Sequence, residues 1–242
     1  MPNHITNILT SSKALIDSMK SKDSEFYFNV LVPMPAVMVS RSPHHGVIEY
    51  AKIAMGVTNL SVLQKSHAHP ADSFKAGNIK ASADALEQSN ILRAMSSGPF
   101  PKDYSDADFE DFVACCRAIK ETGFPSWYEW SLKHWGTKRN AYSIKRCSDT
   151  RIKFLTAWSM PTPIIEALIN SCCSDLRLDW ADENFGCNCG IIRYQAGCNA
   201  EVQAFENDSD AAREHALNVI YGGELPDHME RRAGKICYKE ES

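Results

Sequence analysis

The chain has 242 residues, enough for one large domain or two small ones. Hydrophobic residues make up 44% of it and charged residues 23%, which excludes a disordered, collagen-like or coiled-coil protein. Twenty-six Lys and Arg against 30 Asp and Glu give a formal net charge of −4. This balance argues against a nucleic-acid-binding protein whose whole surface is cationic, and it is compatible with a local basic patch.

Targeting signals and cysteine usage bear on the compartment. The first residues have neither the positive segment nor the apolar run of a secretory signal. No segment approaches the roughly 20 apolar residues that a membrane span needs. Of nine cysteines, two pairs are adjacent, Cys115-Cys116 and Cys172-Cys173, which favours reduced thiols over disulfides. We expect a cytoplasmic protein inside a host cell, with no membrane partner and an oligomeric state that the sequence leaves open.

The first 35 residues predict a β-α-β unit. Alternation over 4–10 predicts a strand, and Ser11 or Ser12 offers an N-cap to the helix that follows. The aromatic and β-branched run 25–32 predicts a second strand. No glycine-rich phosphate-binding pattern follows either strand, so nucleotide binding by such loops has no support.

Residues 36–126 lack this alternation and predict a largely helical insertion or a separate subdomain. The clearest helix begins at Ser105, with acidic residues in its first turn, and ends before Gly123. Its apolar residues recur at helical spacing. A second helix is predicted over 81–95.

The rest of the chain alternates between strands and helices. In chain order the pattern predicts a helix 127–135, a hairpin of strands 141–147 and 151–159, a helix from Thr162, strands 176–180, 188–194 and 201–205, and a helix 210–220. The short connections exclude parallel crossovers. We therefore expect an α+β fold: a ferredoxin-like antiparallel sheet with helices on one face, formed by 1–35 and 127–242, and a helical insertion over 36–126.

Several segments resemble one known family. They are Met1-Pro2-Asn3-His4-Ile5-Thr6-Asn7, the run 28–35, Trp127-Tyr128-Glu129-Trp130, Trp135-Gly136-Thr137-Lys138, Thr156-Ala157-Trp158-Ser159, and the stretch from Trp180 to Gly190. Together they resemble the YubB-type ferredoxin-like domain family of phages, conjugative plasmids and prophages. The resemblance implies the fold and a mobile-element setting, without an iron–sulfur cluster or an established activity. Relatives often carry an aromatic residue where this chain has Arg139.

Six basic residues fall within sixteen positions of the central part of the chain and predict a binding surface for a partner or for nucleic acid: Lys138, Arg139, Lys145, Arg146, Arg151 and Lys153. Alternation places Lys145, Arg151 and Lys153 on the face opposite the core. The aromatic residues of these strands, Tyr142, Phe154 and Trp158, are predicted on the core side. A solvated charged face is the alternative interpretation.

The five tryptophans predict one aromatic core that joins a helix to the sheet: Trp127, Trp130, Trp135, Trp158 and Trp180. An exposed group of them would instead indicate a binding hot spot.

Catalytic and metal signatures are weak. Asp182 and Glu183 face opposite sides of a strand and cannot form an acid–base pair, and no nucleophile motif is present. We expect no catalytic residues and no cofactor. Cys187 and Cys189, with Cys198, leave a metal site open as an alternative, although the spacing of the first two differs from that of zinc knuckles.

The function that we expect is that of a non-catalytic accessory protein of a mobile element, which binds a host protein complex and inhibits a defence system such as CRISPR. Its charged surfaces, including the acidic residues Glu201, Glu206, Asp208 and Asp210, would meet that partner. The first alternative is a nucleic-acid-binding module that uses the basic face of the sheet. The second is a metal-dependent activity at Cys187 and Cys189.

Overall fold

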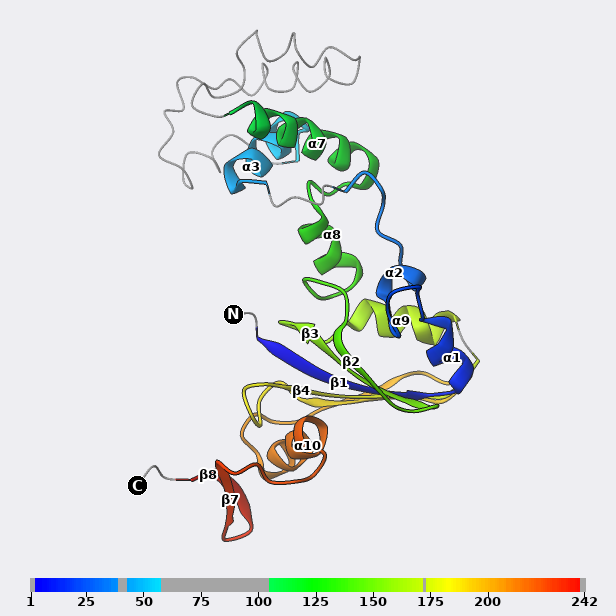
Figure 1. Ribbon diagram of the computed structural model, residues 1–242, viewed down its shortest axis with the longest axis vertical. Coiled ribbons are helices and arrows are strands. Elements are labelled where there is room, and N and C mark those ends of the chain that lie inside the picture. Colours follow the sequence, from blue (N-terminus) through cyan, green and yellow to red (C-terminus); the bar gives the residue numbers. More distant parts are fainter. Residues whose placement is uncertain (1–2, 39–42, 58–104, 172, 240–242) are drawn as a thin grey trace. The chain divides into compact units, whose positions relative to one another are not determined.

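The computed structural model describes residues 3–38, 43–57, 105–171 and 173–239 (Figure 1). The chain divides into two compact units. The first comprises Met1–Pro33 and Ser131–Ser242 and contains the sheet; the second comprises Met34–Trp130 and is helical in most of its described residues.

The first unit is built on a six-stranded antiparallel sheet with the order β2-β3-β1-β4-β5-β6. Its strands are β1 (His4–Ser11), β2 (Tyr142–Ser148), β3 (Arg151–Ala157), β4 (Leu176–Asp182), β5 (Gly190–Tyr194) and β6 (Glu201–Ala204). The first four strands have the order of a ferredoxin-like sheet, and β5 and β6 extend it. The predicted α+β, ferredoxin-like fold is confirmed.

Strand β1 is the centre of this sheet. It pairs along its length with β3 on one side and with β4 on the other. Ile5 and Leu9 are fully buried, and so is Asn7, which donates hydrogen bonds to Thr156 Oγ1 at 2.9 Å and to the Ile5 carbonyl at 3.0 Å. Both edges of β1 are therefore fully used by the sheet.

One face of the sheet, called the first face here, is the apolar face that carries Ile5, Leu9 and Phe154. It is covered by α1 (Lys13–Ser18), α2 (Phe28–Leu31) and α9 (Thr162–Ser171) (Figure 1). Ser12 caps α1 by accepting a hydrogen bond from the Leu15 amide. The fully buried rings of Phe26 and Phe28 pack against Phe154.

The strand predicted over 25–32 is wrong, because these residues form a loop and the short helix α2. Phe26 and Phe28 are buried against the first face, whereas Val30 is 44% exposed. The Phe28 amide donates to the Asn140 side chain at 2.8 Å, and the Tyr27 amide donates to the Met19 carbonyl. Tertiary packing and these local hydrogen bonds override the β-propensity of the run.

The opposite face, called the second face here, is covered at one end by α10 (Asp210–Tyr221), which lies on the other side of the sheet from α9 (Figure 1). Its buried residues form a cluster with Ile8, Ala181 and the hairpin of β7 (Met229–Arg232) and β8 (Lys235–Tyr238). Helices therefore lie on both faces of the sheet, whereas the sequence predicted them on one face only.

In the second unit, α3 (His45–Ala54) packs against α7 (Asp106–Thr122) around a buried aromatic and aliphatic cluster. The helix predicted after Ser105 is confirmed: Ser105 and Asp108 form a capping box, and Gly123 ends the helix at φ 82°. Helix α8 (Trp127–His134) is also present where it was predicted. The helix predicted over 81–95 lies outside the described residues.

Gly190, at the start of β5, leaves room for the Trp180 indole. A Cβ at this position would lie 2.4 Å from the Gln203 carbonyl oxygen and 2.5 Å from Trp180. A Cβ added at Gly197 would have no atom within 4 Å, so only the backbone φ of 82° disfavours a larger residue there.

We predict that Gly190→Ala lowers the free energy of unfolding by ~1–3 kcal/mol, because the added methyl group overpacks the sheet. Urea denaturation measures the loss. Gly197→Ala is the control, whose strained φ costs about 1 kcal/mol. A loss for Gly190→Ala of less than about 1 kcal/mol would show that β5 does not meet β4 in this register.

Candidate nucleic-acid interface

A row of arginines crosses the second face of the sheet. Thr10 in β1 pairs with Arg151 in β3 and with Arg177 in β4, and Arg177 pairs in turn with Arg193 in β5. Residues directly opposite one another in a sheet point to the same face. Since neighbouring strands lie about 4.8 Å apart, Arg151, Arg177 and Arg193 form a row about 14 Å long. We call these three residues the arginine row.

Two hollows adjoin the arginine row. One, of about 450 Å³, lies between the row and α10, where His215, Asn218 and Val219 line it. The other, of about 660 Å³, extends past Arg177 and Arg193 to the residues around Ser12. Thr10 and Arg177 line both hollows, whereas Arg151 lines only the first and Arg193 only the second.

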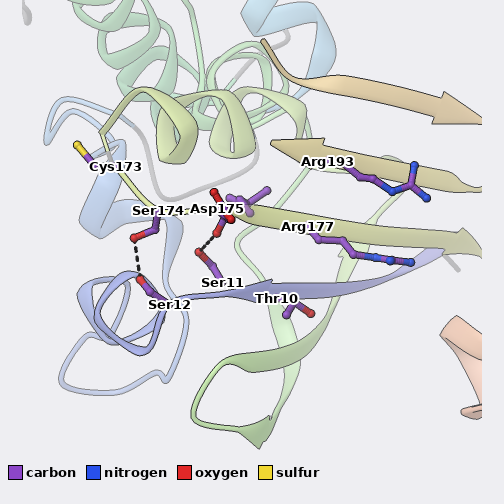
Figure 2. A pocket seen from close by; sticks show the side chains of 9 residues that line it. Thr10, Ser11, Ser12, Cys173, Ser174, Asp175, Arg177 and Arg193 are labelled. Atoms are coloured by element: carbon purple, nitrogen blue, oxygen red, sulfur yellow. Dashed lines mark hydrogen bonds between the residues drawn. The ribbon is translucent and has the colours of Figure 1, made fainter. Parts of the chain in front are cut away.

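Figure 2 shows the second hollow from close by. The Arg177 and Arg193 side chains extend side by side from adjacent strands, away from a group of serines at the other end. Ser11 Oγ donates to the Asp175 carbonyl at 2.6 Å, and Ser12 Oγ donates to Ser174 Oγ at 3.0 Å. These bonds fix the serine end of the hollow.

The charge of the arginine row is only partly neutralised. Arg177 donates two hydrogen bonds to Asp179, at 2.8 and 2.7 Å, and these bonds raise the pKa of Arg177. Arg193 donates to the neutral Gln203 side chain at 3.0 Å. Arg151 forms no ion pair with any residue that the structure describes. Two of the three guanidinium groups are thus available to an anion.

The predicted basic residues divide between several places. Lys145 lies opposite Lys153, and Arg151 lies two residues before Lys153, so the register puts all three on the second face. Lys145 and Arg151 are exposed there. They extend the arginine row along the hairpin of β2 and β3.

Lys153 has a structural role. Its ammonium group donates to the carbonyls of Val219 at 3.0 Å and Ile220 at 2.7 Å, in the last turn of α10. Burial lowers the pKa of Lys153. A cation at a helix C-terminus is favourable, because it meets the unpaired carbonyls and the negative end of the helix dipole. Lys153 therefore holds α10 on the second face.

Arg146 is engaged elsewhere. It lies opposite Ile152, on the first face, and its guanidinium group is 2.8 Å from the Asp17 carboxylate of α1 and 3.6 Å from Glu25. The bond from Arg146 lowers the pKa of Asp17. Arg146 ties α1 to the β2–β3 hairpin and does not join the arginine row.

Lys138 and Arg139 lie near the other end of the sheet. Lys138 Nζ is 4.6 Å from the centroid of the Trp158 ring, a cation–π distance. Both residues line a cavity with His4 and Tyr142.

The aromatic residues differ in part from their predicted positions. Phe154 is buried in the core, but Trp158 is 40% exposed, so it does not belong to the predicted tryptophan core. It follows the end of β3 at φ 75°, which breaks the alternation of the strand. Tyr142 lies opposite Leu155 and therefore on the second face.

Sequence reasoning missed Arg177 and Arg193. The signal that was available is the alternation in β4, where Leu176, Leu178 and Trp180 are buried and leave Arg177 on the other face. Arg193 meets Arg177 only through the pairing of β4 with β5, which spans sixteen residues of chain.

The cysteines of the predicted metal site have separate partners. Cys189 is buried beside the Ala212 carbonyl, and burial raises its pKa to about 11. Cys187 is half-buried near Asp208, and its pKa is raised by burial and then by Asp208 and Asp182; Cys198 is exposed. Zinc binds the thiolate, which both shifts disfavour. Among the residues that the structure describes, no three His, Cys, Asp or Glu side chains are grouped to hold a metal ion.

Three of the acidic residues named from the sequence, Asp182, Asp208 and Asp210, have partners in the structure. The Asp182 carboxylate accepts hydrogen bonds from the Asn184 amide at 2.9 Å and the Asn188 side chain at 3.2 Å. Asp208 pairs with Arg213 at 2.8 Å, and Asp210 pairs with Lys235 at 3.3 Å. These contacts fix loops around α10.

A match to a known protein family agrees with the fold. The family model for the ferredoxin-like domain in Api92-like protein matches residues 134–222. The crystal structure of a protein api92 from Yersinia pseudotuberculosis is similar over 85% of this chain and 99% of its own, with 9% sequence identity and a TM-score of 0.33. No curated protein matches. The expected ferredoxin-like domain is thus found under the Api92-like description.

Among the helices within 3–38, 43–57, 105–171 and 173–239, none is both long and apolar enough to cross a bilayer.

We predict that Lys153→Met lowers the free energy of unfolding by ~1–3 kcal/mol, because two carbonyls of α10 lose a charged donor. Lys145→Met, opposite it in the sheet, removes the same charge from an exposed position and is expected to change stability by less than about 0.5 kcal/mol. Urea denaturation of both variants makes the comparison. Equal losses would contradict the capping role of Lys153.

His215 predicts a pH dependence of stability. Burial lowers the pKa of His215 in the folded protein, and Asp179 opposes this shift only in part. As pH falls through the unfolded value of about 6.5, the unfolded chain takes up the proton first, so stability decreases. His215→Gln removes this contribution, and chemical denaturation between about pH 7.5 and 5 measures it. Parallel curves for the variant and the wild type would refute the assignment.

Proposed function

We propose that the ferredoxin-like unit binds single-stranded nucleic acid on the second face of its sheet, with the arginine row in contact with the phosphate backbone. The observation that carries the proposal is the strand register, which aligns Arg151, Arg177 and Arg193 across four strands. This is the nucleic-acid-binding alternative that the sequence left open, with Arg177 and Arg193 added and with Lys138, Arg139, Arg146 and Lys153 lying outside the row.

The chemistry of the row favours phosphate. A guanidinium group presents a planar fork of donors that matches two phosphate oxygens. Arg151 and Arg193 are exposed, and no carboxylate among the described residues pairs with either. A row about 14 Å long can follow an extended backbone over several phosphates.

The shape of the surface favours a single strand. The arginine row lies in a depression that is bounded on one side by α10. The two hollows, of about 450 and 660 Å³, offer room beside the row for bases that are not stacked in a duplex.

The action on a host protein complex rests on the resemblance and on the charged surfaces named in the sequence analysis. The alignment of three arginines supports an anionic ligand instead. The mobile-element setting, the inhibition of a defence system and the cytoplasmic location remain predictions, and each is compatible with a nucleic-acid-binding module.

The test is a fluorescence-anisotropy titration of the full chain with labelled single-stranded RNA and DNA at several salt concentrations. We expect binding that weakens steeply with salt, because counterions are released from the phosphates. The double variant Arg151→Gln/Arg193→Gln should lower the slope of log K against log salt by ~1.4, about 0.7 for each phosphate that the variant no longer neutralises.

The control variant is Lys22→Gln/Arg117→Gln, which removes the same charge from exposed residues that do not belong to the second face. It should keep the wild-type slope. The proposal fails if the wild type does not bind either probe, or if both double variants weaken binding equally. Thermal unfolding of each variant shows that it is folded.

A further inference from the structure

A cavity of about 510 Å³ opens beside the amino-terminal end of β1, and the proposed function does not use it. Its lining residues are His4, Lys138, Arg139, Asn140, Ala141, Tyr142 and Ala157. Its walls are largely the small side chains of Ala141 and Ala157 and the rings of His4 and Tyr142. Apolar walls with a few polar groups are typical of a small-molecule site.

The loop that forms the rim of the cavity is firmly held. The buried Thr137 hydroxyl donates to the Ala157 carbonyl at 2.8 Å and accepts from the Ala157 amide at 3.1 Å. Asn140 Oδ1 accepts from the Phe28 amide at 2.8 Å, and Ser131 Oγ donates to the Lys138 carbonyl at 2.9 Å. The cavity is thus preorganised, which lowers the entropic cost of binding.

A hydrogen-bonded pair lies in the wall. His4 Nδ1 and Tyr142 Oη are 2.6 Å apart, and the two rings meet edge to face with centroids 5.7 Å apart. Burial and the charge of Glu183 raise the pKa of Tyr142, against the opposing effect of Arg139. The phenol therefore keeps its proton at neutral pH, and the pair offers fixed polar edges to a ligand.

Two cations stand at the rim. Arg139 is exposed and forms no ion pair with any residue in the described part of the chain. Lys138 is fixed by its contact with the Trp158 indole, 4.6 Å from the ring centroid. An apolar cavity next to two cations suits a ring that carries an anionic group.

We propose that this cavity binds one nucleotide, with its unstacked base between the walls formed by His4, Tyr142, Ala141 and Ala157, and its phosphate at Lys138 and Arg139. The ligand is either a free mononucleotide or one nucleotide of a bound strand. The second possibility rests on the proposed function.

The register connects this cavity with the arginine row. His4 and Thr10 lie on the same face of β1, and six residues of strand separate them, or about 20 Å. Lys145 is exposed on the same face between the two positions. A strand held at the arginine row would pass Lys145 on the edge strand β2 to reach the cavity, where a single base would be read.

The experiment is isothermal titration calorimetry of the full chain with the 5′-monophosphates of adenosine, guanosine, cytidine and uridine, and with the nucleosides that lack the phosphate. We expect at least one monophosphate to bind, and to bind more tightly than its nucleoside. Arg139→Gln should weaken binding of the monophosphate by ~10-fold, because a charge-assisted hydrogen bond is removed. The affinity for the nucleoside should not change.

Filling the cavity provides the second variant. Ala141→Leu occupies part of the space and should weaken every monophosphate that binds the wild type, whereas Ala141→Ser keeps the volume and should bind nearly as the wild type does. Inorganic phosphate is the further probe: binding as tight as that of a monophosphate would overturn the role of the base. The inference also fails if no monophosphate binds, or if Ala141→Leu has no effect.

Failure of this site and failure of the proposed function are distinguishable. If single-stranded nucleic acid binds with a steep salt dependence and Ala141→Leu does not change the base preference, the cavity is not a base site. The proposal for the arginine row is then retained. If monophosphates bind and single-stranded nucleic acid does not, the proposal for the cavity is retained and the arginine row does not bind nucleic acid. The control Lys22→Gln/Arg117→Gln, which touches neither site, should leave monophosphate binding unchanged.

Discussion

The pairing of β1 with both β3 and β4 is the constraint on which the rest of the structure depends. Because side chains alternate along a strand, this pairing fixes which residues of six strands share a face. A slip of one residue would move Arg177 to the apolar face and Leu178 to the polar one. The burial of Ile5, Asn7 and Leu9 makes such a slip costly, so the core specifies the position of the charged residues.

The two faces of the sheet are used differently. The first face is closed by short helices and aromatic packing, with Arg146 as a tie to α1. The second face is divided: α10 covers one end and is held by Lys153, and the remainder carries exposed cations and hollows. A ferredoxin-like sheet that is free on one side offers a whole face to a ligand, whereas this one offers a bounded groove.

Elements with local signals could be predicted from the sequence. Ser105 and Gly123 define α7 through its caps, and the alternation around Phe154 defines β3. The strand predicted over 25–32 is wrong because the β-propensity of these residues competes with packing against distant residues, and sequence periodicity carries no information on that packing. The basic residues were partly predicted in the same way: alternation placed Arg151 on the correct face, but nothing local shows that Lys153 caps a helix more than sixty residues away, or that Arg177 joins the row.

Strand β6 ends the six-stranded sheet with four residues that are all exposed, including Val202 at 65%. The outer backbone groups of such a strand can pair with a strand of another molecule. Its shortness limits this pairing, since few hydrogen bonds form. Replacing these residues with a longer apolar strand would favour edge-to-edge aggregation, so the short edge strand limits association between copies of the domain.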